Sequence, residues 1–171
     1  MALKLRRILF GSVIALPVYV GSVAFLVYFL PYHEVLRIVG AETRRPVSTS
    51  KSDITTHDVF YIFAEDLETK NPRVFRNEDT RLGFPWYFKF NSPELQAVAQ
   101  SIADERGTAL LTYYGWRIKF FSIVPNVTNI ERAAPDEEPP IPWFNLGFAV
   151  VVIGGTALLG FWIRGVWKRR R

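Results

Sequence analysis

The chain has 171 residues, of which 49% are hydrophobic and none is cysteine, and it carries a formal net charge of +5. The absence of cysteine excludes disulfides and every thiol-based mechanism. The basic excess lies in two short stretches beside long apolar runs, where it indicates membrane topology and argues against nucleic-acid binding.

The first apolar run covers residues 8–30 and contains no charged side chain. A helix of that length would extend roughly 34 Å, slightly more than the hydrocarbon core of a bilayer. A cleaved signal peptide is the alternative, because residues 22–24 form a small-x-small triplet of the kind that signal peptidase reads. Six further apolar residues follow that triplet, so the pattern favours a retained membrane anchor.

The sequence after this run predicts an α+β domain over residues 31–131. Short apolar runs with period-two alternation, bounded by turn residues, are typical of strands. Gly40 should end the first strand, and the polar residues 41–56 should form a loop. Residues 108–114 and 117–124 should pair as a hairpin. The expected strands are residues 33–39, 58–64, 74–76, 84–90, 108–114, 117–124 and 126–130. Five or six of these seven candidates are expected to form one mostly antiparallel sheet.

The segment of residues 84–90, FPWYFKF, is the most aromatic of these candidates. Its alternation predicts a half-buried strand, and Pro85, which donates no hydrogen bond, places it at a sheet edge. The four side chains expected on its apolar face are Phe84, Trp86, Phe88 and Phe90.

One helix should follow this segment. Ser92 is a suitable N-cap, Pro93 suits the first helical position, and Gly107 suits the C-terminal end. The apolar residues recur on a single helical face, so the helix is expected to pack against the sheet.

The second apolar run covers residues 143–163 and follows a Pro-rich acidic linker, residues 132–142. The basic ends then place both termini in the cytoplasm and the domain in the periplasm. The expected fold is therefore a membrane-anchored α+β protein, with two transmembrane helices flanking a small sheet and one packed helix. Its parts are residues 1–7 (cytoplasmic tail), 8–30 (first transmembrane helix), 31–131 (periplasmic domain), 132–142 (linker), 143–163 (second transmembrane helix) and 164–171 (basic cytoplasmic tail).

Candidate chemical groups are few. His33 and His57 each precede an acidic residue, but neighbouring strand residues point to opposite faces, so neither pair makes a ligand set or a catalytic dyad. The chain contains no zinc spacing, phosphate loop, dinucleotide motif or nucleophile elbow. Residues 73–81 form the richest polar cluster, which could hold an anion, although a salt-bridged surface turn is the preferred interpretation. We predict no catalytic residue, metal ligand or cofactor.

The aromatic side chains are too numerous for one small core, and exposed aromatic patches usually mark interfaces. Glycines on one helix surface favour close helix packing. The candidate partner contacts are Trp86, Tyr87, Tyr113, Tyr114 and Trp116 in the domain and Gly154, Gly155 and Gly160 in the second apolar run.

Several runs of this chain resemble those of a family of alphaproteobacterial membrane proteins that is classed as a domain of unknown function: RIVGAETRR, VFRNEDT, PWYFKFNSPELQA, YYGWRIKFFSI and IPWFN. The resemblance covers nearly the whole chain. It implies a Gram-negative inner membrane, and it brings no activity and no catalytic residue. By layout alone, the chain is also similar to the Surfeit-type assembly factors of cytochrome oxidase.

The first functional hypothesis is a non-catalytic accessory or assembly subunit of a bacterial inner-membrane complex, with an energy-transducing complex as one candidate. Its partners would be membrane lipids and other inner-membrane proteins, and not nucleic acid. The alternative is a binding module for a lipid or small apolar ligand, held in a closed cavity between the aromatic strand and the helix. An enzyme of unknown type is the third hypothesis.

Overall fold

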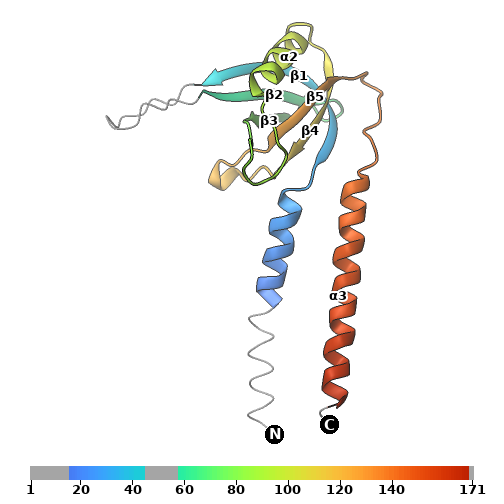
Figure 1. The fold of residues 1–171 in the computed structure, drawn as a ribbon. Coiled ribbons are helices and arrows are strands. Elements are labelled where there is room, and N and C mark those ends of the chain that lie inside the picture. Colours follow the sequence, from blue (N-terminus) through green and yellow to red (C-terminus); the bar gives the residue numbers. More distant parts are fainter. Residues whose placement is uncertain (1–15, 45–57, 170–171) are drawn as a thin grey trace, which may run out of the picture.

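The structure is a computed structural model that describes residues 16–44 and 58–169 (Figure 1). A small barrel lies at one end of two helices, Leu16–Tyr28 and α3 (Trp143–Arg169). Residues 8–15 of the first apolar run, His57 and the outermost basic residues lie outside the described residues.

Five strands form the barrel: β1 (Tyr32–Arg44), β2 (Val59–Asp66), β3 (Pro72–Asn77), β4 (Thr108–Tyr114) and β5 (Asn126–Arg132). Their order around the closed barrel is β1-β2-β3-β5-β4, and all pairs are antiparallel except β3 with β5. One helix, α2 (Ser92–Asp104), connects β3 to β4. This strand order with this helix is the topology of an OB-fold, a five-stranded Greek-key barrel. The expectation of a small, mostly antiparallel sheet with one packed helix is confirmed.

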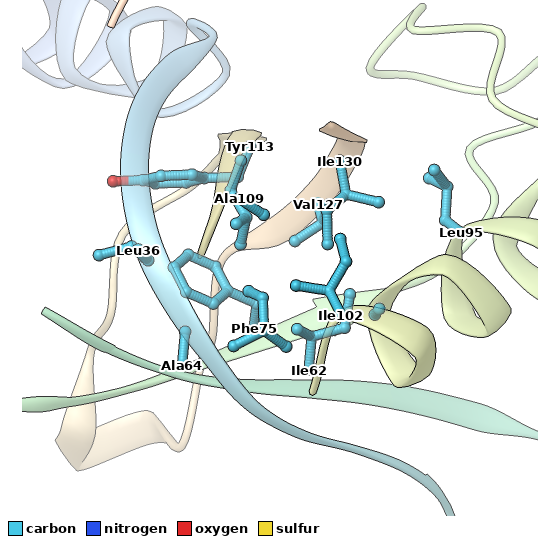
Figure 2. Close-up of a cluster of buried hydrophobic side chains, with 13 residues drawn as sticks. Leu36, Ile62, Ala64, Phe75, Leu95, Ile102, Ala109, Tyr113, Val127 and Ile130 are labelled. Atoms are coloured by element: carbon cyan, nitrogen blue, oxygen red, sulfur yellow. The ribbon is translucent and has the colours of Figure 1, made fainter. Parts of the chain in front are cut away.

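The barrel interior is filled by alternate strand residues, as the period of two requires. Leu36, Ile62, Phe75, Leu111 and Val127 are at most 1% exposed. Figure 2 shows Leu36, Ile62, Phe75 and Val127 converging with residues of α2, which closes one end of the barrel. The α2 residues buried against them are Leu95, Ala99 and Ile102. The apolar stripe of the helix is thus what caps the core.

The predicted strand over residues 84–90 is wrong, because this segment is an irregular loop between β3 and α2. A closed barrel has no free edge to which another strand could add. The alternation persists with its faces reversed: Lys89 is 5% exposed and Tyr87 is half-buried, whereas Trp86 and Phe88 are 68% and 58% exposed. The polar members of the segment therefore point inward.

The hairpin prediction is wrong in its second arm. The chain after β4 forms a loop with a short 3-10 turn, η1 (Lys119–Phe121), and the strands that pair with β4 are β1 and β5. Gly115 makes the turn out of β4 with φ +94°, a conformation that favours glycine. A Cβ there would lie 3.1 Å from the Tyr28 hydroxyl, so the loop passes directly over the end of the N-terminal helix.

Gly40 does not end the first strand. β1 continues through a bulge between Ile38 and Gly40, pairs with β4 before it, and pairs with β2 from Leu36 onward. A bulge bends a strand, which allows one long strand to serve both sides of a small barrel. Residues 41–44 of the predicted loop therefore belong to β1, and residues 45–57 lie outside the described residues.

The boundaries of α2 differ slightly from the predicted ones. Its N-cap is Asn91, whose side chain makes no capping hydrogen bond. The Asp79 carboxylate instead accepts from the backbone N–H and the hydroxyl of Ser92, at 2.9 and 2.7 Å. At the other end, Arg106 takes the left-handed conformation, with φ 52°. The cap at the start of α2 is therefore provided by Asp79, in the loop that precedes the helix.

In the part of the chain that the structure describes, one helix is long and apolar enough to cross a membrane, over Trp143–Trp162. The helix Leu16–Tyr28 is apolar but shorter than a span, and two spans therefore stay a prediction. The two helices run side by side from the same side of the barrel (Figure 1). Asn145 Nδ2 donates to the Pro31 carbonyl at 2.7 Å, and the hydroxyls of Tyr19 and Thr156 are hydrogen-bonded.

Candidate functional site

The junction between the N-terminal helix and the barrel is fixed by hydrogen bonds and ring contacts. The Tyr87 hydroxyl donates to the Phe29 carbonyl at 2.6 Å, and the Gly115 N–H donates to the Tyr28 carbonyl at 2.9 Å. Burial raises the pKa of Tyr87 to about 12, so this phenol keeps its proton and stays a donor into the alkaline range. The barrel is thereby held in one position above the helices.

A set of exposed apolar side chains surrounds this junction, and we call it the aromatic rim. It comprises Leu82, Phe84, Trp86, Phe88, Phe120 and Phe121, each between 49% and 89% exposed. They come from the loop after β3 and from η1, both of which lie on the side of the barrel from which the helices leave (Figure 1). Phe84 also packs on the helix, with its ring centroid 4.6 Å from that of Phe29. The rim is thus continuous with the apolar helix surface.

An apolar groove of about 390 Å³ lies between the rim and both helices. Its walls include Leu26, Phe29, Phe84, Trp86, Phe144 and Phe148. The groove is open and borders the helices. It therefore differs from the closed cavity between residues 84–90 and α2 that the ligand-binding hypothesis predicts.

The barrel mouth next to the helices holds a polar cluster. Arg73 donates two hydrogen bonds to the Glu34 carboxylate, at 3.2 and 2.8 Å, and the Tyr113 hydroxyl donates to the same carboxylate at 2.8 Å. Burial, followed by the hydrogen bond to Glu34, raises the pKa of Tyr113 well above its usual value. The charges of Arg73 and Glu34 neutralise each other, and the cluster closes the end of the core next to the helices.

A pocket of about 700 Å³, the mouth pocket, opens beside this cluster. Residues that line it include Tyr32, Arg73, Tyr113, Trp116, Arg117 and Lys119. The pocket thus combines three cationic side chains with three aromatic ones. Trp116 packs edge-on against Tyr28 of the helix, at 5.5 Å between ring centroids, which puts one wall of the pocket at the helix end.

A buried lysine, Lys89, lies between the start of α2 and the start of β5. Lys89 Nζ donates to Asn77 Oδ1 and to the Val127 carbonyl, at 2.5 and 2.6 Å. Burial lowers the pKa of Lys89 to about 8, against a smaller opposite effect of Asp79 and Glu78. Its partners are neutral groups, so Lys89 links the loop before α2 to β3 and β5 by hydrogen bonds and not by an ion pair.

A family profile described as "Protein of unknown function (DUF1523)" matches residues 5–170. The chain belongs to this family. A relative from Haemophilus influenzae, a proteobacterium, bears the name "Uncharacterized protein" and is 37% identical over 144 residues, which cover 81% of this chain and 82% of that protein. No solved structure matches the chain. The predicted domain-of-unknown-function family is thus confirmed, whereas its alphaproteobacterial and inner-membrane aspects stay predictions.

The predicted contact residues of this DUF1523 chain separate into three groups. The first group lies at the surface, with Trp86 in the aromatic rim and Trp116 in the wall of the mouth pocket. The second group lies beneath the surface. Tyr87 stacks on Tyr114 at 4.9 Å between ring centroids, and Tyr113, only 9% exposed, belongs to the polar cluster with Arg73 and Glu34. The third group lies on α3 with open space at the position of an added Cβ: Gly154, Gly155 and Gly160. The structure thus brings together the five aromatic candidates around one junction, away from the glycines.

The polar candidates of the DUF1523 chain have structural partners. His33 Nδ1 lies 3.0 Å from the Thr112 hydroxyl, and Arg76 forms an ion pair with Glu78 at 2.6 Å. Residues 73–81 are therefore salt-bridged, as the preferred interpretation predicts, although Arg73 reaches across the barrel to Glu34. Across residues 16–44 and 58–169, no group of three or more His, Asp or Glu is placed to hold a metal ion.

The sequence pattern of this DUF1523 member does not predict some residues of the site, because their positions depend on the tertiary fold. The pattern puts Lys89 on the second face of an edge strand, and Arg117 and Lys119 in a hairpin arm. It shows Glu34 only as a neighbour of His33. The one usable signal is the coincidence of basic and aromatic residues in YYGWRIKFF, which the structure turns into the wall of one pocket.

Proposed function

We propose that this protein is a non-catalytic accessory subunit of a bacterial inner-membrane complex. Two membrane helices would anchor its OB-type barrel on the periplasmic side, with both termini in the cytoplasm. The observation that carries the proposal is the aromatic rim, a set of six large apolar side chains that are all exposed, which is typical of an interaction surface.

The membrane placement is supported by the basic stretches flanking two apolar runs. It is also supported by the hydrogen bond between Asn145 and the Pro31 carbonyl, which aligns the barrel-side ends of the two helices. If α3 spans the membrane, the N-terminal helix beside it would then lie in the membrane as well. This placement puts the aromatic rim at the boundary between lipid and water, where aromatic side chains are favoured.

The occupant we favour for the rim is another integral membrane protein. The open surface continues from Trp86 down α3, where Gly154, Gly155 and Gly160 have open space at the position of an added Cβ. Small residues allow a second helix to approach closely. One partner with membrane helices and an outer portion could cover both regions together.

Site-specific photo-crosslinking in native membranes tests this function. A photoreactive residue replaces Trp86 or Phe120 in the rim, and the matched control replaces Ala97, which is exposed on α2 at the opposite end of the barrel. We expect one discrete adduct with an integral membrane protein from the rim positions and none from Ala97. Adducts only to lipid, or a protein that runs alone after gentle solubilisation, would refute the subunit proposal.

A second candidate function is the binding of a small apolar ligand or acyl chain, favoured by the groove between Phe29, Trp86 and Phe148. Its volume of about 390 Å³ lies within the range of small-molecule sites. Native mass spectrometry of the purified full chain would show a retained small molecule, lost on Phe148→Ala and kept on Phe161→Ala farther along α3. Equal retention by both variants would exclude the groove.

A further inference from the structure

The mouth pocket carries a positive charge that the described part of the barrel does not neutralise. Arg73 is satisfied by Glu34, at 2.8 Å between Nη2 and Oε2. Arg117 donates to the Ile123 carbonyl, at 2.8 Å, which is a neutral acceptor. Within the described residues, neither Arg117 nor Lys119 has an ion-pair partner. Two cationic groups of this region therefore face the pocket with their charge available to an anion.

The position of the pocket restricts which anion can reach it. Trp116 Nε1 donates to the Tyr32 hydroxyl at 3.3 Å, and that hydroxyl donates to the Val27 carbonyl near the end of the N-terminal helix, also at 3.3 Å. These two rings form the wall of the pocket nearest the helix end. If the helices cross the bilayer, the pocket opens at the level of the lipid head groups, where Trp and Tyr are enriched.

The lining suits an amphipathic molecule. Beside its cations, the pocket presents Pro72, Val74 and Pro125 together with the Tyr32 and Trp116 rings. Its volume of about 700 Å³ exceeds what a bare phosphate would fill. An anion that brings glycerol and the first carbons of an acyl chain would use both kinds of surface.

We propose that the mouth pocket is a binding site for the head group of an anionic phospholipid. Lys119 and Arg117 contact the phosphate, and Trp116 and Tyr32 pack against the glycerol and the upper acyl carbons. Charge-assisted hydrogen bonds to phosphate are among the stronger polar interactions in proteins. The inference rests on the membrane placement proposed above, but it does not require a partner protein.

Native mass spectrometry of the full chain in detergent, titrated with short-chain phosphatidylglycerol, tests this site. We expect one bound lipid, with affinity reduced about tenfold by Lys119→Gln or by Arg117→Gln. Arg106→Gln is the matched control, because Arg106 is an exposed arginine at the opposite end of the barrel. Phosphatidylcholine of the same chain length should bind more weakly than phosphatidylglycerol.

The controls distinguish a bound lipid from a free phosphate compound and from non-specific attraction of charge. Glycerol 1-phosphate should compete poorly, and equal competition would assign the pocket to a free phosphate compound and overturn the lipid proposal. Equal loss in Lys119→Gln and Arg106→Gln would also overturn it, because the attraction would then be non-specific. A topology reporter on the C-terminus tests membrane placement separately, and crosslinking at Trp86 tests the partner.

Discussion

At the barrel end away from the two helices, α2 covers the core with Leu95, Ala99 and Ile102, each at most 5% exposed. At the end next to the helices, Trp86 and Phe120 lie 68% and 89% exposed. Both ends contain large apolar side chains, but only the first hides them. Burial at the α2 end accounts for the stability of the fold, whereas the uncovered end is where a partner or lipid would bind.

The largest expected difference in the free energy of unfolding is between a Phe→Ala substitution in the core and one in the aromatic rim. Phe75→Ala in the core should lower the free energy of unfolding by about 3–5 kcal/mol, because it removes a fully buried ring and leaves a cavity. Phe120→Ala in the rim should change it by less than about 0.5 kcal/mol. Thermal unfolding of the full chain in detergent measures both.

The matched pair also predicts opposite results in the membrane. Phe120→Ala should keep the fold and weaken crosslinking from position 86, whereas Phe75→Ala should reduce the amount of folded protein. Similar loss of stability in both variants would show that the rim is part of the core, which would contradict the proposed division between the two ends.

Lys89 should make the stability of the fold sensitive to alkaline pH. Its pKa is about 8 in the folded protein, below the ordinary 10.5, so between these values the unfolded chain binds a proton that the folded chain does not. Stability should therefore be lowest below pH 8 and should rise by at most about 2.5 kcal/mol up to pH 10. Above pH 10 the raised pKa of Tyr87 acts in the opposite direction, because the unfolded chain ionises first.

Unfolding midpoints between pH 7 and 10 test this prediction, with Lys89→Met as the variant that should lose the rise. Lys70→Met is the control, because Lys70 is exposed in the turn between β2 and β3. A rise that persists in Lys89→Met would place the titrating group elsewhere.

The sequence was sufficient where local pattern and tertiary context agree. The single-faced helix after Pro93 and the alternation in β4 and β5 predict elements that the structure contains. The pattern of residues 84–90 was misleading, because period-two alternation does not say which face is buried or whether a neighbouring strand is free. Closure of the barrel through the β3–β5 pair at Arg76 and Asn126 is a long-range property that no local window carries.

The candidate site depends on the same long-range closure. The exposed aromatics could be anticipated from their number alone, although Tyr113 is in the core and not on the surface. The mouth pocket could not be anticipated, because Arg73 and Lys119 are 46 positions apart and meet only after β4 has turned over the helix at Gly115. Sequence separation hides such a pocket until the topology is known.

Gly115 allows the junction at the uncovered end to be tested. Gly115→Ala should cost about 1–2 kcal/mol, because its φ of +94° is unfavourable for alanine and the new Cβ would lie 3.1 Å from the Tyr28 hydroxyl. Gly154→Ala, which has open space around it on α3, is the control and should be near neutral. Equal effects would mean that the loop does not rest on the helix end.

The smallest expected effect concerns the start of α2, where the first turn of the helix depends on Asp79 in the preceding loop. Asp79→Ala removes the acceptor for the Ser92 N–H and hydroxyl, a loss comparable with removing an N-cap, about 1 kcal/mol. Asp79→Asn keeps one oxygen acceptor and should recover most of that loss, whereas Asn91→Ala should cost little because its side chain makes no cap. Hydrogen exchange at the first turn of α2 measures this locally. If Asn91→Ala opened the turn more than Asp79→Ala, the cap would come from the N-cap residue itself, and the loop that carries the aromatic rim would not be tied to the stable end of the barrel.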